Sequence, residues 1–401
     1  MPADLQHADT TGLRAAMVDR LTAAGVLTHP RLRDALLSMP REALLPHAYV
    51  GVSGPGADPI EWRLLDGTHP DDRQEWLGLI HGDDSVLMQR DGEPLDALPR
   101  GPVTGGHMTS MSTNLLVTAE ILQALRLEPG QRYLELGPGP GGSLALAAAV
   151  TGPLRAVGIE RDGHMTAFAQ RGLDRLGLDA TVLEGDALDG HPEGAEFDRI
   201  HSGIGVPRLP RAWVEQLAPG GRMLTTLATR TPSWPGRLEV TRTLAGRLEA
   251  TLRGRPRGYR PMLGYRWLHA VDHRARIQAA PGTPRTTRFV PPPDDAYGFW
   301  LAAAYLVGAV VREFQADTMT LVAPDDGSWA VAGPSEGTVH VHGPRDIWAE
   351  LEALHARWKK AGCPDAYRVD LDDGTGEQHV TSTAGPKALG WPLPPLPAVP
   401  H

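Results

Sequence analysis

The sequence predicts an α/β fold with a mostly parallel sheet, followed by a C-terminal region of α+β character. Between 132 and 227, short apolar runs typical of strands alternate with helical runs. Such alternation predicts parallel strands covered by helices on both faces. After about Arg230 the alternation is replaced by a span rich in Arg, Pro and Gly that ends in a triple proline at 291–293. A chain of 401 residues is also long enough for two domains.

The elements follow from apolar spacing and from the positions of Gly and Pro. Apolar residues at helical spacing predict helices over 13–24 and after Pro30. The segment 50–106 is rich in Gly, Pro and Asp, so we expect an irregular segment that covers a site, with one short helix near 71–79. The alternating region predicts strands at 132–136, 155–159, 181–184, 199–201 and 222–227, and helices at 142–150, 164–176 and 211–217.

The C-terminal region contains both kinds of element. We expect a buried apolar run at 300–311, two strands at 318–322 and 328–332 around an Asp-Asp-Gly turn, and a charged amphipathic helix at 344–360. The Pro-rich end is predicted to be extended and to pack through Trp391. Three further tryptophans are predicted to lie in the core rather than in a ligand cage: Trp300, Trp329 and Trp348.

Composition and charge exclude several classes of protein. Hydrophobic residues make up 41% and charged residues 22%, which is ordinary globular composition. No apolar run reaches the roughly 20 residues that span a bilayer, and the N-terminus does not resemble a signal segment, so we expect a cytoplasmic protein without membrane contact. The net charge of −9 argues against a general nucleic-acid partner. Cys363 is the single cysteine, so no intrachain disulfide and no Cys-rich metal site are expected, and we predict a buried structural thiol.

The strongest chemical signal is a glycine-rich loop, Leu134 to Gly142, between a predicted strand and a predicted helix. Glycines allow a ligand to approach the backbone, and the helix N-terminus presents free N–H groups. Glu160 follows roughly 20 residues later at the end of the next strand, where a carboxylate can bind ribose hydroxyls. Asp186 ends the third strand, in reach of an adenine amine. This spacing favours S-adenosylmethionine, with S-adenosylhomocysteine as product, over a dinucleotide. The alternatives are a tight turn without ligand and a helix-capping role for Asp186.

With these residues in place, the chain resembles the protein-L-isoaspartate O-methyltransferase family from about Leu13 to Leu227. Met39-Pro40-Arg41-Glu42 is similar to the family's Val-Pro-Arg-Glu, and Gly106 to Ser112 lies where the family has Gly-Gln-Thr-Ile-Ser-Gln-Pro. Val206 to Pro210 and Leu217 to Arg222 resemble two later motifs of the family, an Ala-Pro-Glu-Ile-Pro turn and a Leu-Lys-Pro-Gly-Gly-Arg strand entry. The resemblance implies a Rossmann-like class I methyltransferase fold.

Site residues follow from the motif and the resemblance together. The residues expected to bind the cofactor are Glu135, Gly137, Pro138, Gly139, Gly141, Glu160, Arg161, Gly185, Asp186, Ala187 and Ser202. The resemblance places Ser110 on the family's active-site serine, where its hydroxyl would hold one oxygen of an acceptor carboxylate. Thr109, Ser112 and His107 are neighbouring candidates. The alternative is that these polar residues cap the helix expected near Asn114.

Three departures from the family pattern lead to a narrower expectation. Met111 and Ser112 replace the glutamine and proline of the serine motif, and residues 50–106 form an insertion. A C-terminal domain of about 170 residues follows the catalytic region. We do not expect such a domain in housekeeping repair enzymes. The arrangement resembles homologues that accompany ribosomally made, modified peptides such as lanthipeptides, lasso peptides and graspetides. In those homologues an aspartate side chain of a cyclised precursor peptide is methyl-esterified and then closes to an aspartimide.

The predicted division of the chain has three parts: 1–105 as N-terminal helices and cover segment of the catalytic domain, 106–230 as the S-adenosylmethionine-binding core, and 231–401 as an extension that recognises substrate. An Arg-rich stretch in the extension could bind an acidic peptide, form a solvated face or contact RNA; it comprises Arg253, Arg255, Arg257, Arg260, Arg266, Arg274 and Arg276. Two other functions stay open, namely repair of L-isoaspartyl residues in proteins and a scaffold that binds cofactor without methyl transfer. The sequence does not indicate a metal site or an oligomeric state.

Overall fold

The computed structural model describes residues 10–53, 59–194, 196–229, 235–255, 259, 274–280, 282–315, 318–333, 337–371, 376–382 and 389–397. The chain divides into two compact units. The first comprises Met1–Gly203 and Pro210–Leu224, and the second comprises Ile204–Leu209 and Thr225–His401. Each unit is described by itself below.

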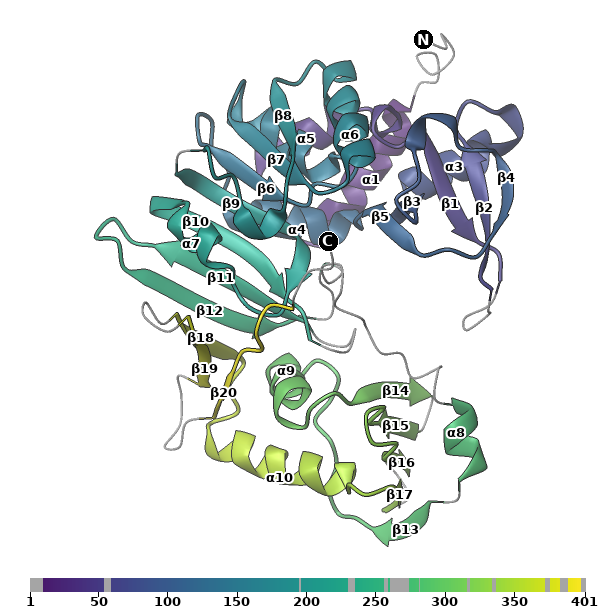
Figure 1. Ribbon diagram of the computed structural model, residues 1–401, viewed down its shortest axis with the longest axis vertical. Helices are drawn as coiled ribbons and strands as arrows, with labels where there is room; N and C mark the ends of the chain where they lie inside the picture. Colours follow the sequence, from purple (N-terminus) through teal and green to yellow (C-terminus); the bar gives the residue numbers. More distant parts are fainter. Residues whose placement is uncertain are drawn as a thin grey trace. The chain divides into compact units, whose positions relative to one another are not determined.

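The first unit contains a parallel sheet with strand order β9-β6-β7-β8 (Figure 1). All four residues of β6 are buried, as expected for a central strand covered on both faces. Helices α5 and α6 pack against these strands. The elements of this region are β6 (Tyr133–Leu136), α5 (Gly142–Thr151), β7 (Ala156–Glu160), α6 (Gly163–Arg175), β8 (Ala180–Glu184), η4 (Ala187–Asp189), β9 (Phe197–Val206), α7 (Arg211–Glu215) and β10 (Leu217–Leu227).

The predicted strands and helices of this region are confirmed, but the prediction of a mostly parallel sheet is wrong. Parallel pairs join β9 to β6, β6 to β7 and β7 to β8. The sheet as a whole has ten strands in the order β20-β19-β18-β12-β11-β10-β9-β6-β7-β8. Antiparallel pairs join β11 to β12, β12 to β18, β18 to β19 and β19 to β20. The C-terminal strands therefore extend the sheet through antiparallel pairs, which need no crossover helix.

Helices at the N-terminus bury one face each, as predicted. Helix α1 (Thr11–Ala23) buries Met17, Val18 and Leu21, and α2 (Pro30–Ser38) follows with proline at its first position. A short 3-10 helix, η2 (Arg41–Ala43), begins within the Met-Pro-Arg-Glu motif. Helix α4 (Leu115–Leu125) is capped by the Asn114 side chain, which accepts a hydrogen bond from the Leu116 N–H at 2.8 Å.

The segment 47–112 is an antiparallel sheet, so the prediction of an irregular segment is wrong. Its strand order is β4-β2-β1-β3-β5, and the predicted short helix is confirmed as α3. The Trp76 side chain of α3 is fully buried and donates from Nε1 to the Leu45 carbonyl at 2.8 Å. The elements are β1 (His47–Gly51), β2 (Glu61–Asp66), α3 (Pro70–Ile80), β3 (Val86–Arg90), η3 (Leu95–Ala97), β4 (Gly101–Thr104) and β5 (Met108–Ser112).

The second unit combines the antiparallel strands of the large sheet with a separate five-stranded sheet of order β13-β17-β16-β15-β14. The predicted strands at 318–322 and 328–332 and the long charged helix are confirmed as β15, β16 and α10. Its elements are β11 (Gly236–Arg242), β12 (Leu248–Gly254), α8 (Arg274–Ala279), β13 (Thr283–Thr286), α9 (Tyr297–Leu306), β14 (Val311–Gln315), β15 (Thr318–Val322), β16 (Trp329–Gly333), β17 (Thr338–His342), α10 (Ile347–Lys360), β18 (Ala366–Leu371), β19 (Gln378–Ser382) and β20 (Gly390–Pro392).

Aromatic side chains form the core of the second unit. Trp300, Trp329 and Trp348 are each buried, as predicted. Trp391 is also buried and stacks on Tyr305 with ring centroids 5.4 Å apart, which confirms its predicted packing role. The prediction of a buried thiol is wrong, because Cys363 follows the end of α10 with φ +52° and is exposed.

Candidate active site

The glycine-rich loop connects β6 to the N-terminus of α5. Gly137, Gly139 and Gly141 have φ values of +74°, +53° and +87°, which only glycine adopts readily. A Cβ on Gly139 would lie 3.2 Å from the Ser110 Oγ and 3.3 Å from the Met111 carbonyl oxygen. The loop backbone is therefore in close contact with β5, and a side chain at 139 would fill the space between them.

Glu160 ties the end of β7 to this loop. Its Oε2 accepts a hydrogen bond from the Gly139 N–H at 3.1 Å, and its Oε1 accepts one from the Arg161 N–H at 2.9 Å. Burial raises the pKa of the Glu160 carboxyl, although backbone hydrogen bonds from Asp162, Gly139 and Arg161 act in the opposite direction. The carboxylate thus lies directly beside the glycine loop, as the spacing predicts, with lone pairs left for further hydrogen bonds.

At the end of β8, the Gly185-Asp186-Ala187 turn leads into η4. Asp186 Oδ1 accepts a hydrogen bond from the Leu188 N–H at 2.9 Å, so the residue does cap this short helix. Asp186 is partly exposed, whereas Ala187 is buried. The Gly185 N–H donates to the Glu160 carbonyl at 2.9 Å. Because β6, β7 and β8 are adjacent and parallel, the glycine loop, Glu160 and Asp186 lie in that order along one edge of the sheet.

Two of the four residues predicted to contact the acceptor lie against the glycine loop. A Cβ on Gly142 would lie 3.5 Å from the Ser112 Oγ, and a Cβ on Gly139 would lie 3.2 Å from the Oγ of Ser110. Within the described part of the chain the Ser110 hydroxyl makes no hydrogen bond. Thr109 Oγ1 instead donates to Gln89 Oε1 at 2.9 Å and accepts from the Gly92 N–H at 3.1 Å. His107 is exposed. Ser112 is buried and lines a small cavity with Arg41. Asn114, rather than these serines and threonines, caps α4.

Two residues predicted to bind the cofactor are fully enclosed by protein. Glu135 has no exposed surface; its Oε2 accepts from the Tyr133 hydroxyl at 2.9 Å, and its Oε1 accepts from the Ser143 hydroxyl. His201 Nδ1 lies 3.6 Å from the same Oε1. Ser202, next on β9, is likewise fully buried. Neither side chain offers a surface to a ligand, so we assign Glu135 to a buried polar network that holds β6, α5 and β9 together.

The sequence did not reveal one link that holds β5 in position. Gln89 on β3 is 1% exposed, and its Nε2 donates to Asp162 Oδ2 at 2.9 Å while its Oε1 accepts from Thr109. Asp162 Oδ1 in turn caps α6 by accepting from the N–H groups of His164 and Met165. The capping role of Asp162 had a recognisable signal just ahead of the predicted helix. Gln89 had none, because its segment gave no clear strand pattern.

The described part of the chain offers little toward other kinds of site. Within it, no group of three or more His, Cys, Asp or Glu side chains could hold a metal ion. None of the helices it contains is long and apolar enough to cross a membrane. Of the Arg-rich stretch, Arg257, Arg260 and Arg266 fall outside the described residues. Arg253 on β12 is exposed and pairs with Asp365 at 3.6 Å.

A glycine loop after the first strand of a parallel sheet, with carboxylates at the ends of the next two strands, defines a Rossmann-like methyltransferase. The comparisons with known proteins identify which kind. The family model "Protein-L-isoaspartate(D-aspartate) O-methyltransferase (PCMT)" matches residues 102–232. The protein-L-isoaspartate O-methyltransferase of Pyrococcus abyssi is 30% identical over 177 residues, which cover 44% of this chain and 76% of the relative. The chain belongs to the protein-L-isoaspartate O-methyltransferase family, whose cofactor is S-adenosylmethionine.

Two further matches extend the comparison. The enzyme of the same name from Aeropyrum pernix is 27% identical over 219 residues, covering 54% of this chain and 67% of the relative. A solved structure of a protein-L-isoaspartate O-methyltransferase superposes with a TM-score of 0.51 at 18% identity, covering 92% of this chain and 99% of that one. That coverage reaches well into the C-terminal extension. From the sequence, we expect the C-terminal extension to set this chain apart from repair enzymes. In fold, however, the extension does not distinguish this chain from that solved structure.

Proposed function

We propose that this chain transfers a methyl group from S-adenosylmethionine to a carboxylate oxygen of an aspartyl-type residue in a peptide or protein. The donor would be held by the glycine loop, with Glu160 toward its ribose and Asp186 toward its adenine; Arg161, Pro138, Gly185 and Ala187 would flank it. The observation that supports this best is the position of Ser110. Its hydroxyl, which has no hydrogen-bond partner among the residues that the structure describes, lies against Gly139, whose N–H donates to Glu160.

The chemistry demands alignment more than acid–base catalysis. A carboxylate acceptor is already ionised near neutral pH, so no side chain needs to remove a proton. When bound, the donor supplies an electrophilic methyl group on a sulfonium. Ser110 would donate a hydrogen bond to one acceptor oxygen and leave the other free to attack in line. The link from Thr109 through Gln89 to Asp162 fixes the strand that carries this serine.

Two acceptors fit this proposal. The first is an L-isoaspartyl residue, which agrees with the names of the relatives. The second is an aspartate side chain in a cyclised ribosomal peptide precursor, which the replacements Met111 and Ser112 in the serine motif favour. In the second case the next backbone nitrogen would attack the methyl ester, lose its proton and expel methanol, which leaves an aspartimide. Recognition of the peptide by the 231–401 extension is part of the same proposal.

The test uses the purified full chain with isotopically labelled S-adenosylmethionine and three peptides. A linear isoaspartyl peptide, its linear L-aspartyl counterpart and a cyclic L-aspartyl peptide are compared for base-labile label. Turnover of the isoaspartyl peptide alone supports the first acceptor. Turnover of the cyclic peptide followed by loss of methanol, which leaves the peptide one water lighter than the starting material, supports the second. Binding of the donor without label in any peptide would support the scaffold function instead and contradict the proposal.

Ser110→Ala tests the role of the serine. Loss of one hydrogen bond to a charged group is worth about 1.5–3 kcal/mol, so we expect kcat/KM to fall about 10- to 100-fold while donor affinity stays unchanged. Ser38→Ala serves as the control, because the Ser38 hydroxyl donates only to backbone carbonyls of its own helix. Equal activity of the Ser110 variant and the wild type would remove the serine from the mechanism.

A further inference from the structure

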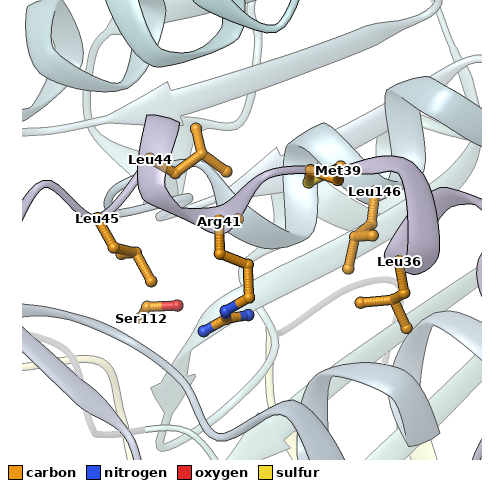
Figure 2. Close-up of a pocket in the computed structure, with 8 residues that line it drawn as sticks. Leu36, Met39, Arg41, Leu44, Leu45, Ser112 and Leu146 are labelled. Atoms are coloured by element: carbon orange, nitrogen blue, oxygen red, sulfur yellow. The ribbon is translucent and has the colours of Figure 1, made fainter. Parts of the chain in front are cut away.

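A small cavity lies where η2, β5 and the N-terminus of α5 meet, within the first unit (Figure 2). The space left for the centre of a water-sized sphere is about 10 Å³, which is room for about one water or one oxygen atom. Apolar side chains form most of its wall, and the polar groups are few. The lining residues are Leu36, Met39, Arg41, Leu44, Leu45, Ser112, Gly142 and Leu146.

Arg41 brings a buried positive charge to this cavity. It is 7% exposed, and its Nε donates to the Ile80 carbonyl at 2.6 Å. Among the described residues, no acceptor bonds its two terminal nitrogens and no carboxylate forms an ion pair with it. Burial lowers the pKa of Arg41 to about 10, although the charge of the neighbouring Glu42 carboxylate acts in the opposite direction, so the guanidinium stays charged at neutral pH. A buried cation without a bonded anion is costly, and these free N–H groups indicate that an anionic group belongs there.

Two other features of the cavity favour an anion. Ser112 is 8% exposed, and its hydroxyl has no hydrogen-bond partner in the described part of the chain. Figure 2 shows this hydroxyl directed toward the Arg41 guanidinium. Gly142 is the first residue of α5, a helix of 10 residues, whose N-terminus carries a partial positive charge. The cavity thus combines a cation, a hydroxyl and a helix N-terminus, a combination suited to a carboxylate oxygen.

We propose that Arg41, with Ser112 and the N-terminus of α5, binds the carboxylate of the methionine part of the donor. This inference rests on the proposed function. The order of groups along the sheet edge supports it, because Asp186 follows β8 and Glu160 follows β7. A donor with adenine at Asp186 and ribose at Glu160 extends its methionine end past the loop after β6, where α5 begins. The acceptor peptide also carries carboxylates, so the experiment must separate the two sources.

Isothermal titration calorimetry with two probes tests the proposal without turnover. S-Adenosylhomocysteine carries the carboxylate, whereas 5′-methylthioadenosine lacks the whole amino-acid end. For Arg41→Met we expect the Kd for S-adenosylhomocysteine to rise about 10- to 100-fold, since a hydrogen-bonded charge pair is lost, while the Kd for 5′-methylthioadenosine is unchanged. Arg41→Lys should fall between Arg41→Met and the wild type. Ser112→Ala is a milder change in the same cavity and can replace Arg41→Met if that variant fails to fold. We expect Ser112→Ala to weaken S-adenosylhomocysteine binding severalfold.

Arg175→Met is the matched control. The Arg175 guanidinium also donates to η2, through the Ala43 carbonyl at 2.7 Å, but it does not line the cavity. Both probes should bind this variant as they bind the wild type.

Three results would overturn the inference. Unchanged S-adenosylhomocysteine affinity in the Arg41 and Ser112 variants would exclude a donor site. The same unchanged affinity with a raised KM for the peptide would assign the cavity to the acceptor carboxylate. An equal loss of both probes would show that Arg41 acts only on the structure of the loop. A wild-type chain that binds neither probe would contradict the proposed function itself, which is a different failure.

Discussion

Replacing Glu42 by glutamine removes one charge from the Met-Pro-Arg-Glu motif with little change in shape. The Glu42 carboxylate is buried in the first unit, with His81 Nε2 3.6 Å from its Oε1. Burial alone would raise the pKa of this carboxyl, but the interactions with the nearby His81 and Thr10 side chains outweigh burial and lower the pKa to about 2. The ionised form of the Glu42 side chain is therefore more stable in the folded chain than in the unfolded chain.

The size of the effect follows from the two pKa values. The carboxyl has an ordinary value of 4.5 and a folded value of about 2. Each unit of difference between the two pKa values corresponds to about 1.4 kcal/mol. The charge therefore contributes about 3 kcal/mol to the free energy of unfolding at neutral pH. Because the folded pKa is the lower one, this stabilisation is present above about pH 4.5 and is lost as the pH falls toward 2. Glu42→Gln should therefore be less stable than the wild type by up to about 3 kcal/mol at pH 7.

Urea unfolding between pH 7 and pH 3 measures this difference. The difference in free energy of unfolding between variant and wild type should be constant down to about pH 5 and should become smaller below that pH. Glu128→Gln is the control, because Glu128 is exposed and a surface substitution changes stability by about 0.5 kcal/mol or less. A gap that stays the same at every pH would show that lost packing, not lost charge, destabilises the variant.

Two further substitutions test the glycine loop and the second unit. Gly139→Ala should cost about 1–2 kcal/mol of stability through its positive φ and should also lower kcat, because its Cβ would lie 3.2 Å from the Ser110 Oγ. Gly130→Ala is the control, because Gly130 has a similar φ of +81° but nothing lies within 4 Å of the new Cβ. Thermal unfolding should report a comparable loss of stability for this variant, while its kcat stays unchanged. Equal kcat values for the two variants would contradict contact with Ser110. Trp391→Ala should destabilise the second unit by about 3–5 kcal/mol in denaturant unfolding, and a change below 1 kcal/mol would refute its role in the core.

The parallel core could be predicted because its signals are local. Strands β6 and β7 are short apolar runs. Helix α5 after β6 begins at Gly142, and α6 after β7 begins behind the capping residue Asp162. The glycine loop and Glu160 mark two strand ends, and parallel pairing brings them to one edge without further information. Sequence spacing was therefore enough to place Glu160 beside Gly139.

The sheet at 47–112 could not be predicted in the same way. Strand β4 consists of Gly101, Pro102, Val103 and Thr104, a composition more typical of a turn. It becomes a strand only by pairing with β2, a contact between distant parts of the chain. The cavity at Arg41 likewise forms from η2, β5 and α5, and no local pattern relates these three segments.

Strands β11 and β12 are a different case, since their signal was present. Leu238 and Val240 are fully buried and alternate with more exposed residues along β11, which is the two-residue period of a strand. The composition of the surrounding Arg-rich and Pro-rich span obscured this pattern. These two strands were missed for that reason.

The exposure of Cys363 has a practical consequence. It is the single cysteine of the chain, and it lies in the second unit at the end of α10. A maleimide dye will therefore attach at one defined position without any engineering of the sequence. Fluorescence anisotropy from that dye can follow tumbling of the whole molecule as peptides are titrated, which supplies an assay for partners that needs no methyl donor.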